Sequence, residues 1–190
     1  MKKRVIGLLL ALVLLMSLLP AGAMASGGEE ESGLKELWVN GVNMLAEGNN
    51  SLTLEGGGYA SYDKDSNTLT LRDAIITEGH TVYGGTYGIY AEGVLNIVLE
   101  GTSTAGSDKL DAGVNIDGDL TITGTGSLTA TGDDEAGIDV SGNLTVNGGT
   151  VIGNHTDDTG IDVHGNLTVN SGGTVSGTSS TQEGVHASTL

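Results

Sequence analysis

The sequence predicts an all-β fold: a right-handed single-stranded parallel β-helix of about four to five coils with an N-terminal β cap. Glycine-led segments begin at Gly88, Gly113, Gly137, Gly160 and Gly184, at intervals of 23 to 25 residues. Within each segment, apolar and polar residues alternate with the period of a half-buried strand. No stretch has the apolar spacing of a helix, and short units without a core of their own must stack on one another. Parallel crossovers are right-handed, which sets the expected hand of the coil.

The first 25 residues have the pattern of an export signal. Three cations at residues 2–4 precede an apolar run over residues 5–19, and Ala-Met-Ala at residues 23–25 supplies a cleavage site. We expect a Sec signal peptide at residues 1–25, cleavage after Ala25, and a secreted or cell-surface protein without membrane attachment after cleavage. The chain has no cysteine, which excludes a lipid anchor on cysteine and any disulfide.

Two segments separate this signal from the repeats. Residues 26–36 are polar and are expected to form a flexible leader. Residues 37–87 are expected to form the strands of the N-terminal cap, because alternation in residues 51–54 and 68–71 indicates strands, with a turn at 63–67. Nothing in this segment repeats cleanly, so we expect it to cover the first coil.

The repeat region, residues 88–190, predicts ladders of equivalent side chains, because stacked coils lie about 4.8 Å apart. The predicted interior ladders are Leu95, Leu120, Leu144 and Leu167, and beside them Ile97, Ile122, Val146 and Val169. The segment from Gly184 opens a further coil that is incomplete. An uncovered coil exposes unpaired backbone groups, so we expect either end-to-end self-association through it or a truncated gene product.

The charge is strongly acidic, with a formal net charge of −17 at pH 7. Three of the seven cations lie in the expected signal peptide, whereas all 24 acidic residues follow it, so the mature part is more negative still. Such a field repels nucleic acid and anionic membranes and favours divalent cations. The same acidity also suits the simpler role of keeping an exported β-protein soluble.

Two outward columns flank one corner of the coil and carry oxygen ligands, at the positions two residues after and two residues before each leading glycine. Clustered carboxylates repel one another, and Ca²⁺, which takes six to eight oxygen ligands, would reverse that repulsion. The hypothesis is a Ca²⁺ site formed by Asp139, Asp162, Glu135 and Asp158, with Asp111 and Asn115 in the same columns. The alternative is a solvated acidic edge.

A third polar column, Asp119, Asn143 and Asn166, occupies one turn position in successive coils, where we expect side chains that hydrogen-bond along the turns. The four histidines occupy unlike repeat positions, which argues against a zinc site. The sequence contains no H-E-x-x-H, phosphate-binding loop or G-x-S-x-G motif.

The aromatic residues all lie between Trp38 and Tyr90. Tyr83, Tyr87 and Tyr90 are close together in the sequence and are candidates for a carbohydrate-binding platform, because aromatic faces stack on sugar rings. Trp38 suits the core of the cap equally well.

Three motifs occur together: Leu-Trp-Val-Asn-Gly at residues 37–41, Tyr-Asp followed by Asn-Thr-Leu-Thr-Leu at 62–71, and the repeated Gly-Ile-Asp-Val-x-Gly-Asn-Leu-Thr-Val. With them, residues 37–190 resemble secreted Firmicutes proteins described as carbohydrate-binding domain-containing. The resemblance implies a polysaccharide-lyase-like β-helix that binds Ca²⁺ and plant cell-wall polysaccharide without established catalysis. The incomplete final coil and the missing wall anchor depart from that family.

The expected function is therefore non-catalytic, Ca²⁺-assisted binding of plant or cell-wall polysaccharide. One alternative is a polysaccharide lyase or hydrolase acting on acidic glycans. A lyase uses Arg or Lys as its base, and neither occurs after Lys109. An inverting hydrolase needs only two carboxylates, so Asp139 with Asp162 keeps this alternative open. The other alternative is a structural, adhesin-like repeat spacer.

Overall fold

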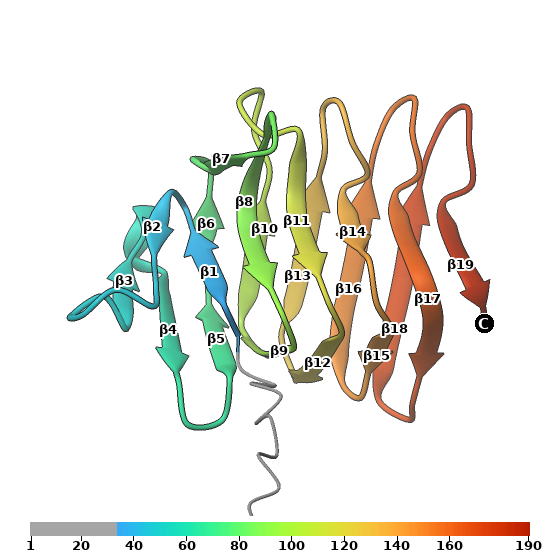
Figure 1. Cartoon of the computed structure of the whole chain (residues 1–190). Helices are drawn as coiled ribbons and strands as arrows, with labels where there is room; N and C mark the ends of the chain where they lie inside the picture. Colours follow the sequence, from blue (N-terminus) through green and yellow to red (C-terminus); the bar gives the residue numbers. More distant parts are fainter. Residues whose placement is uncertain (1–33) are drawn as a thin grey trace, which may run out of the picture. The chain divides into compact units, whose positions relative to one another are not determined.

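The computed structural model describes residues 34–190, and the expected signal peptide and most of the expected leader lie outside these residues. The described chain contains nineteen strands, β1 to β19, and one short 3-10 turn, η1. Its strands wind into stacked parallel coils (Figure 1). The predicted all-β parallel β-helix is confirmed. Among the described residues, no helix has the length and apolar character needed to cross a membrane.

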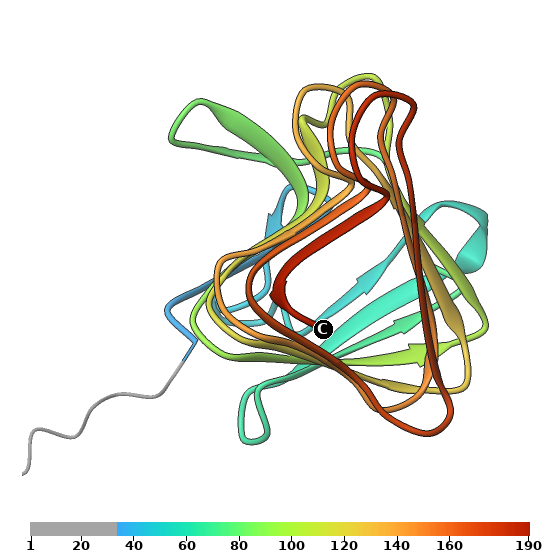
Figure 2. The same ribbon diagram turned by 90° about the vertical axis from the view of Figure 1, so that its right-hand side faces the viewer.

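Each coil contributes one strand to each of three faces, which give the solenoid a triangular cross-section (Figure 2). In this view from the end that carries β19, the chain turns anticlockwise as it approaches the viewer, so the coil is right-handed. Face A consists of β8 (Gly85–Glu92), β11 (Ala112–Asp117), β14 (Ile138–Val140), the first half of β17 (Ile161–Val169) and β19 (Val185–Thr189). Face B consists of β5 (Thr68–Arg72), β9 (Leu95–Glu100), β12 (Leu120–Gly124), β15 (Leu144–Val146) and the second half of β17. Face C consists of β6 (Ile75–Ile76), β10 (Thr102–Ala105), β13 (Ser127–Thr131), β16 (Gly149–Asn154) and β18 (Gly173–Thr178).

The interior is filled by the predicted apolar ladders. The parallel register on face B aligns Leu95, Leu120, Leu144 and Leu167. The same register aligns Ile97, Ile122, Val146 and Val169. Leu144 is fully buried and Leu167 is 7% exposed, whereas Val169, on the last coil of face B, is 46% exposed. The next strand, β19, runs beside β17 only as far as Asn166, so it ends next to Leu167 and leaves Val169 uncovered on that side.

The leading glycine of the repeat marks a close approach of two faces. A Cβ atom on Gly137 would lie 2.7 Å from the carbonyl oxygen of Ala130, and one on Gly160 would lie 2.5 Å from that of Gly153. Side-chain carbons do not approach backbone this closely, so only glycine fits where the chain enters face A beside face C. The glycines that recur every 23 to 25 residues in the sequence therefore mark the point in each coil where this steric constraint applies.

The turn between faces A and B carries the predicted polar column. The backbone N–H and the side-chain amide of Asn143 both donate to Oδ1 of Asp119, at 2.7 and 3.0 Å. One coil further on, the backbone N–H of Asn166 donates to Oδ1 of Asn143 at 3.0 Å. These bonds satisfy turn amides that strand pairing leaves free, so the column links successive coils.

Parallel coils begin earlier than the sequence repeat indicated. β5 pairs in parallel with β9, and β6 pairs in parallel with β10, so the first coil starts at Thr68, before Gly88. We expected residues 37–87 to form only a cap, and their second half instead belongs to the solenoid. Alternating strands of a cap and of a coil look alike in sequence, and this coil lacks the glycine-led motif.

The cap lies at the N-terminal end of the solenoid. It consists of the antiparallel strands β1 (Glu36–Val39), β2 (Val42–Asn43), β3 (Ser51–Thr53) and β4 (Tyr59–Asp63), with the 3-10 turn η1 (Glu55–Gly57) between β3 and β4. β1 pairs with β8 on face A, and β4 pairs with β5 on face B. The cap thus occupies the backbone edges of the first coil on two faces, which removes open edges there.

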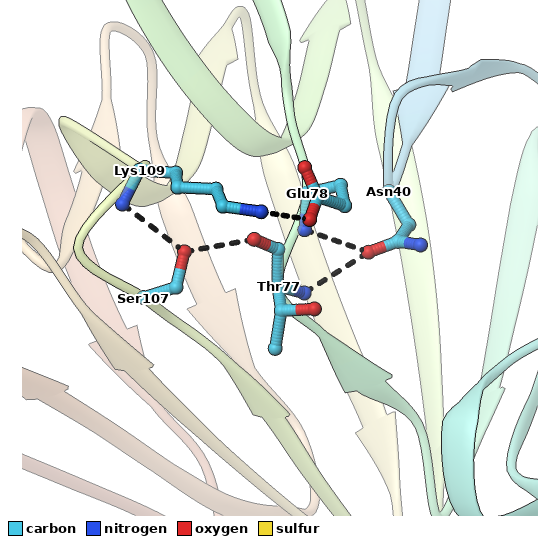
Figure 3. A network of polar contacts seen from close by, with 5 residues as sticks. All are labelled: Asn40, Thr77, Glu78, Ser107 and Lys109. Atoms are coloured by element: carbon cyan, nitrogen blue, oxygen red, sulfur yellow. Dashed lines mark hydrogen bonds and ion pairs between the residues drawn. The ribbon is translucent and has the colours of Figure 1, made fainter.

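A polar network joins the cap to the loops of the first two coils (Figure 3). The backbone N–H groups of Thr77 and Glu78 both donate to Oδ1 of Asn40, at 3.0 and 2.9 Å. The Ser107 hydroxyl donates to the carbonyl of Thr77, and the ammonium of Lys109 pairs with Glu78. Asn40 itself has a φ of 51°, a conformation that asparagine tolerates in tight turns.

Replacement of a ladder leucine tests the stacked core. Leu144→Ala is expected to lower the free energy of unfolding by about 2–5 kcal/mol, because it opens a cavity between two coils. The matched control is Thr145→Ala, which changes the neighbouring outward side chain and should cost less than about 1 kcal/mol. Urea unfolding of a chain that begins at residue 26 measures both, and equal effects would contradict the assigned register.

Replacement of Asn40 tests the network between cap and coils. Asn40→Gly keeps the backbone conformation but leaves two amide N–H groups without their acceptor, so the unfolding free energy should fall by about 1–3 kcal/mol. Asn40→Asp retains the acceptor and serves as the control in the same urea titration. A glycine variant as stable as the aspartate variant would show that the network contributes little.

Candidate functional site

The outer surface of face A carries one continuous column of side chains along the solenoid axis, which we call the axial column. It consists of Tyr90, Asn115, Asp139, Asp162 and His186. These residues point outward because their strand neighbours, such as Ile138 and Ile161, are fully buried in the core. The predicted alignment of this column is confirmed by the strand register.

Three side chains converge in the middle of face A. Asp139, Asp162 and His164 each offer a ligand atom, and these atoms all lie within 4.8 Å of one another. Asp139 and Asp162 are neighbours across one rung, and His164 lies two residues after Asp162 on the same side of β17. The distance from His164 Nε2 to Asp162 Oδ2 is 3.6 Å.

A second histidine reaches the same carboxylate from the next coil. Nδ1 of His186 lies 2.7 Å from Oδ1 of Asp162. The hydrogen bond to Asp162 raises the pKa of His186, and the negative charge of Asp162 adds to this effect. The two oxygens of Asp162 therefore face different imidazoles, Oδ1 toward His186 and Oδ2 toward His164.

The sequence argument, which was made against a zinc site, did not anticipate that His164 and His186 contact the same carboxylate. His164 and His186 occupy unlike repeat positions, but one is a strand neighbour and the other a rung neighbour of Asp162. Both relations bring side chains together on a stacked sheet. The signal that could have found them is Asp-x-His on one strand combined with His186 one period after Asp162.

The carboxyl of Asp139 is the titratable group most strongly affected by this arrangement. Partial burial raises the pKa of Asp139 to about 6, and the negative charges of Asp162, Glu135 and Asp158 add to this effect, whereas His164 opposes it. Asp139 and Asp162 lie on neighbouring rungs of face A, and Glu135 and Asp158 lie in the loops that precede β14 and β17. Their mutual repulsion disfavours the ionised form of Asp139.

Three of the four remaining predicted calcium ligands accept hydrogen bonds elsewhere. Asp111 accepts the backbone N–H of Thr86, and Glu135 accepts the hydroxyl of Tyr87 at 3.2 Å. Asp158 accepts the backbone N–H of Thr159 at 2.6 Å through Oδ1. Asn115 lies in the axial column, between Tyr90 and Asp139. Only Asp139 and Asp162 of the six predicted residues therefore meet in the three-residue cluster.

Calcium is a poor fit to the cluster as it stands. Ca²⁺ takes six to eight oxygen ligands, and the cluster brings together two carboxylates and an imidazole nitrogen. The other acidic side chains nearby already accept hydrogen bonds that hold loops in place. The chemistry of this donor set is that of a mixed nitrogen and oxygen site.

The expected tyrosine platform needs correction. Tyr87 and Tyr90 are 8% and 3% exposed, and they pack on each other with ring centroids 5.8 Å apart. Trp38 on β1 packs against this pair and stacks on His80 of β7 (His80–Val82), with ring centroids 3.6 Å apart. Tyr83 is 94% exposed, at the tip of the β7–β8 hairpin. Two of the three tyrosines therefore do not present a free ring face.

Burial and nearby carboxylates both favour the neutral phenols. Burial raises the pKa of Tyr87 to about 12, with Glu135 adding to the effect, and burial raises that of Tyr90 to about 12 as well. These tyrosines join the first coil to the cap and, through Glu135, to the third coil. Their position serves packing rather than ligand stacking.

A shallow hollow of about 600 Å³, which we call the corner hollow, adjoins the cluster at the corner between faces C and A. It is lined by Asp158, Thr159, Asp162, Thr181, Gln182, Glu183 and His186. Asp162 and His186 belong to both the hollow and the axial column. A second hollow of about 730 Å³ lies at the cap, where Leu34, Met44 and Leu45 provide apolar surface.

Three basic side chains of the described chain form ion pairs around the cap and the first two coils. Lys35 pairs with Glu92 at 2.7 Å, and Arg72 pairs with Glu100 at 2.5 Å while it also lies over the ring of Tyr59. Lys109 pairs with Glu78. Since neither Lys nor Arg follows Lys109 in the sequence, His164 and His186 are the basic side chains beside the cluster.

Comparisons with protein-family models, with curated proteins and with solved structures found no match. The family resemblance of the sequence motifs therefore stays a prediction.

The raised pKa of Asp139 predicts a pH-dependent effect of Asp139→Asn. A carboxyl whose pKa is about 6 when folded and about 3.9 when unfolded favours the folded state at low pH and loses that contribution as the pH rises through 6. With allowance for solvent screening, the substitution should raise the unfolding free energy by about 1 kcal/mol at pH 8 and change it little at pH 4.

Urea unfolding at both pH values in the presence of EDTA measures this difference. Asp117→Asn, on the same face, is the control for loss of one negative charge. A gain in stability of Asp139→Asn that is the same at pH 4 and pH 8 would contradict the environment described for Asp139.

Proposed function

We propose that this chain is an exported, non-catalytic carbohydrate-binding protein that binds a polysaccharide along the axial column and in the corner hollow. The observation that carries the proposal is the row of outward polar groups on face A, which leads into a hollow lined by carboxylates, hydroxyls and an amide. Because successive members of this row belong to successive coils, they lie at regular intervals of about 4.8 Å.

The chemistry of the row suits a polyhydroxylated chain. Asp162, Glu183 and Gln182 offer acceptors for sugar hydroxyls, and His186 offers a donor. A polysaccharide presents hydroxyls periodically along its length, so acceptors on successive coils can meet successive sugars. Rigid strands lower the cost of ordering the protein on binding.

Two arguments favour binding over catalysis. A lyase requires a base near its substrate, and Arg72 and Lys109 are both engaged in ion pairs away from the axial column. An inverting hydrolase separates its carboxyl groups by about 6.5–9.5 Å to hold a water molecule. Asp139 and Asp162 offer oxygens within 4.8 Å of each other, which is too close for that arrangement.

The proposal predicts retention of the mature chain by one or more plant or cell-wall polysaccharides in affinity electrophoresis. Gln182→Ala and Asp162→Asn should each weaken binding roughly five- to tenfold, because each removes hydrogen bonds to sugar hydroxyls. Thr129→Ala, on the outer surface of face C, is the matched control and should bind like the parent protein.

Assays for unsaturated uronides and for new reducing ends should show no product on a polysaccharide that binds. Product formation that Asp139→Asn abolishes would overturn the non-catalytic assignment. If a broad panel of neutral and acidic polysaccharides shows no retention, the binding proposal fails and the spacer alternative is favoured.

A further inference from the structure

We propose that Asp139, Asp162 and His164 form a three-ligand site for a borderline divalent transition metal, with Zn²⁺ as its representative, and that His186 positions Asp162 as a ligand. The site is open on the side of the corner hollow. The inference goes beyond polysaccharide binding and stands independently of it, because the metal is held by the chain's own side chains.

The donor set identifies the class of metal. Zn²⁺ binds imidazole nitrogen and carboxylate oxygen at about 2.0–2.2 Å, so two ligand atoms around a tetrahedral Zn²⁺ lie about 3.3–3.6 Å apart. His164 Nε2 and Asp162 Oδ2 lie 3.6 Å apart, which matches that separation and is too long for a direct hydrogen bond. Asp139 completes the set within 4.8 Å, so a small side-chain rotation brings its oxygen to the ion.

The backbone holds the three ligands in place without a loop. Asp162 and His164 are alternate residues of β17, so they share one side of face A. Asp139 is paired in register with Asp162 from the preceding coil. The strand register thus fixes the backbone positions from which the three side chains extend, which favours a preorganised site.

His186 supplies the outer contact that metal-binding carboxylates commonly have. Its Nδ1 lies 2.7 Å from Oδ1 of Asp162, so this oxygen is held by the next coil. The other oxygen, Oδ2, remains directed toward His164. Such outer partners orient the ligand, and their loss typically lowers metal affinity by 10- to 100-fold.

Local charge favours an ion of double positive charge. Asp139 and Asp162 face each other with Glu135 and Asp158 close by. No Lys or Arg occurs in residues 110–190, so His164 and His186 are the basic side chains beside these carboxylates. A divalent ion would remove the repulsion between the two ligating carboxylates.

Three protein ligands leave a fourth position of a tetrahedral ion free. Asp162 also lines the corner hollow, so a water molecule or an oxygen of a bound molecule can reach that position from the hollow. An ion with an imidazole ligand distinguishes this site from the all-oxygen calcium site that the sequence predicted.

The test is isothermal titration of the mature chain, without a histidine tag and freed of metal by EDTA and dialysis, with Zn²⁺ and separately with Ca²⁺. No polysaccharide is present, so failure here is distinguishable from failure of carbohydrate binding. We expect one Zn²⁺ per chain and Zn²⁺ affinity at least about tenfold above that for Ca²⁺. Absence of Zn²⁺ binding, or tighter binding of Ca²⁺, would overturn the proposal.

Variants separate the ligands from the positioning residue. Asp162→Asn and His164→Ala should each lower Zn²⁺ affinity at least tenfold, and Asp117→Asn, an acidic residue elsewhere on face A, should leave it unchanged. His186→Ala should lower affinity about tenfold, and His186→Asn, whose amide can still donate to Asp162, should restore most of it.

Circular dichroism checks that each variant retains the parent β-sheet spectrum. Co²⁺ in place of Zn²⁺ adds a readout that a purely structural role would not change, because its visible absorption reports the ligands directly. A Co²⁺ spectrum that His164→Ala leaves unaltered would exclude His164 as a ligand.

Discussion

The parallel hydrogen-bonded register between coils is the constraint on which the whole structure depends. Each coil repeats the position of its predecessor at about 4.8 Å, so one residue position becomes a ladder along the axis. Inside, this register stacks Leu120 on Leu144 and Leu167, and the apolar contacts stabilise the chain without disulfides. Outside, the same register stacks Asn115, Asp139 and Asp162. Core and candidate site are thus two sides of the same strands.

The register also concentrates charge, and this sets the chemistry of face A. Like charges on neighbouring rungs repel. The side chains that contact the acidic residues differ between the early and the later coils. Around the cap and the first two coils, lysine and arginine pair with Glu92, Glu100 and Glu78. In the later coils, two histidines contact Asp162, and burial together with neighbouring carboxylates raises the pKa of Asp139. That difference is why the proposed metal site lies in the later coils.

The cap explains why aromatic residues gather at the N-terminal end. An uncovered first coil would leave backbone groups and apolar side chains exposed. β1 pairs with β8 there, and Trp38 lies opposite Tyr90 in that pairing. Tyr87 and Tyr90 are consequently buried beneath the cap and the β7–β8 hairpin, and the polar axial column replaces an aromatic platform as the candidate carbohydrate surface.

The sequence alone determined the architecture, because period-two alternation and glycine spacing are local constraints that every coil repeats. From them the ladder of Leu95 to Leu167, the turn column of Asp119, Asn143 and Asn166, and the alignment of Asp139 with Asp162 were predicted correctly. The features that depend on contacts between different repeat positions were decided by the tertiary structure alone. Contacts across strands and coils bury Tyr87 and bring its hydroxyl to Glu135. They also bring His164 and His186 to the same carboxylate, Asp162. A repeat alignment compares like positions with one another, whereas a folded surface also brings unlike positions into contact.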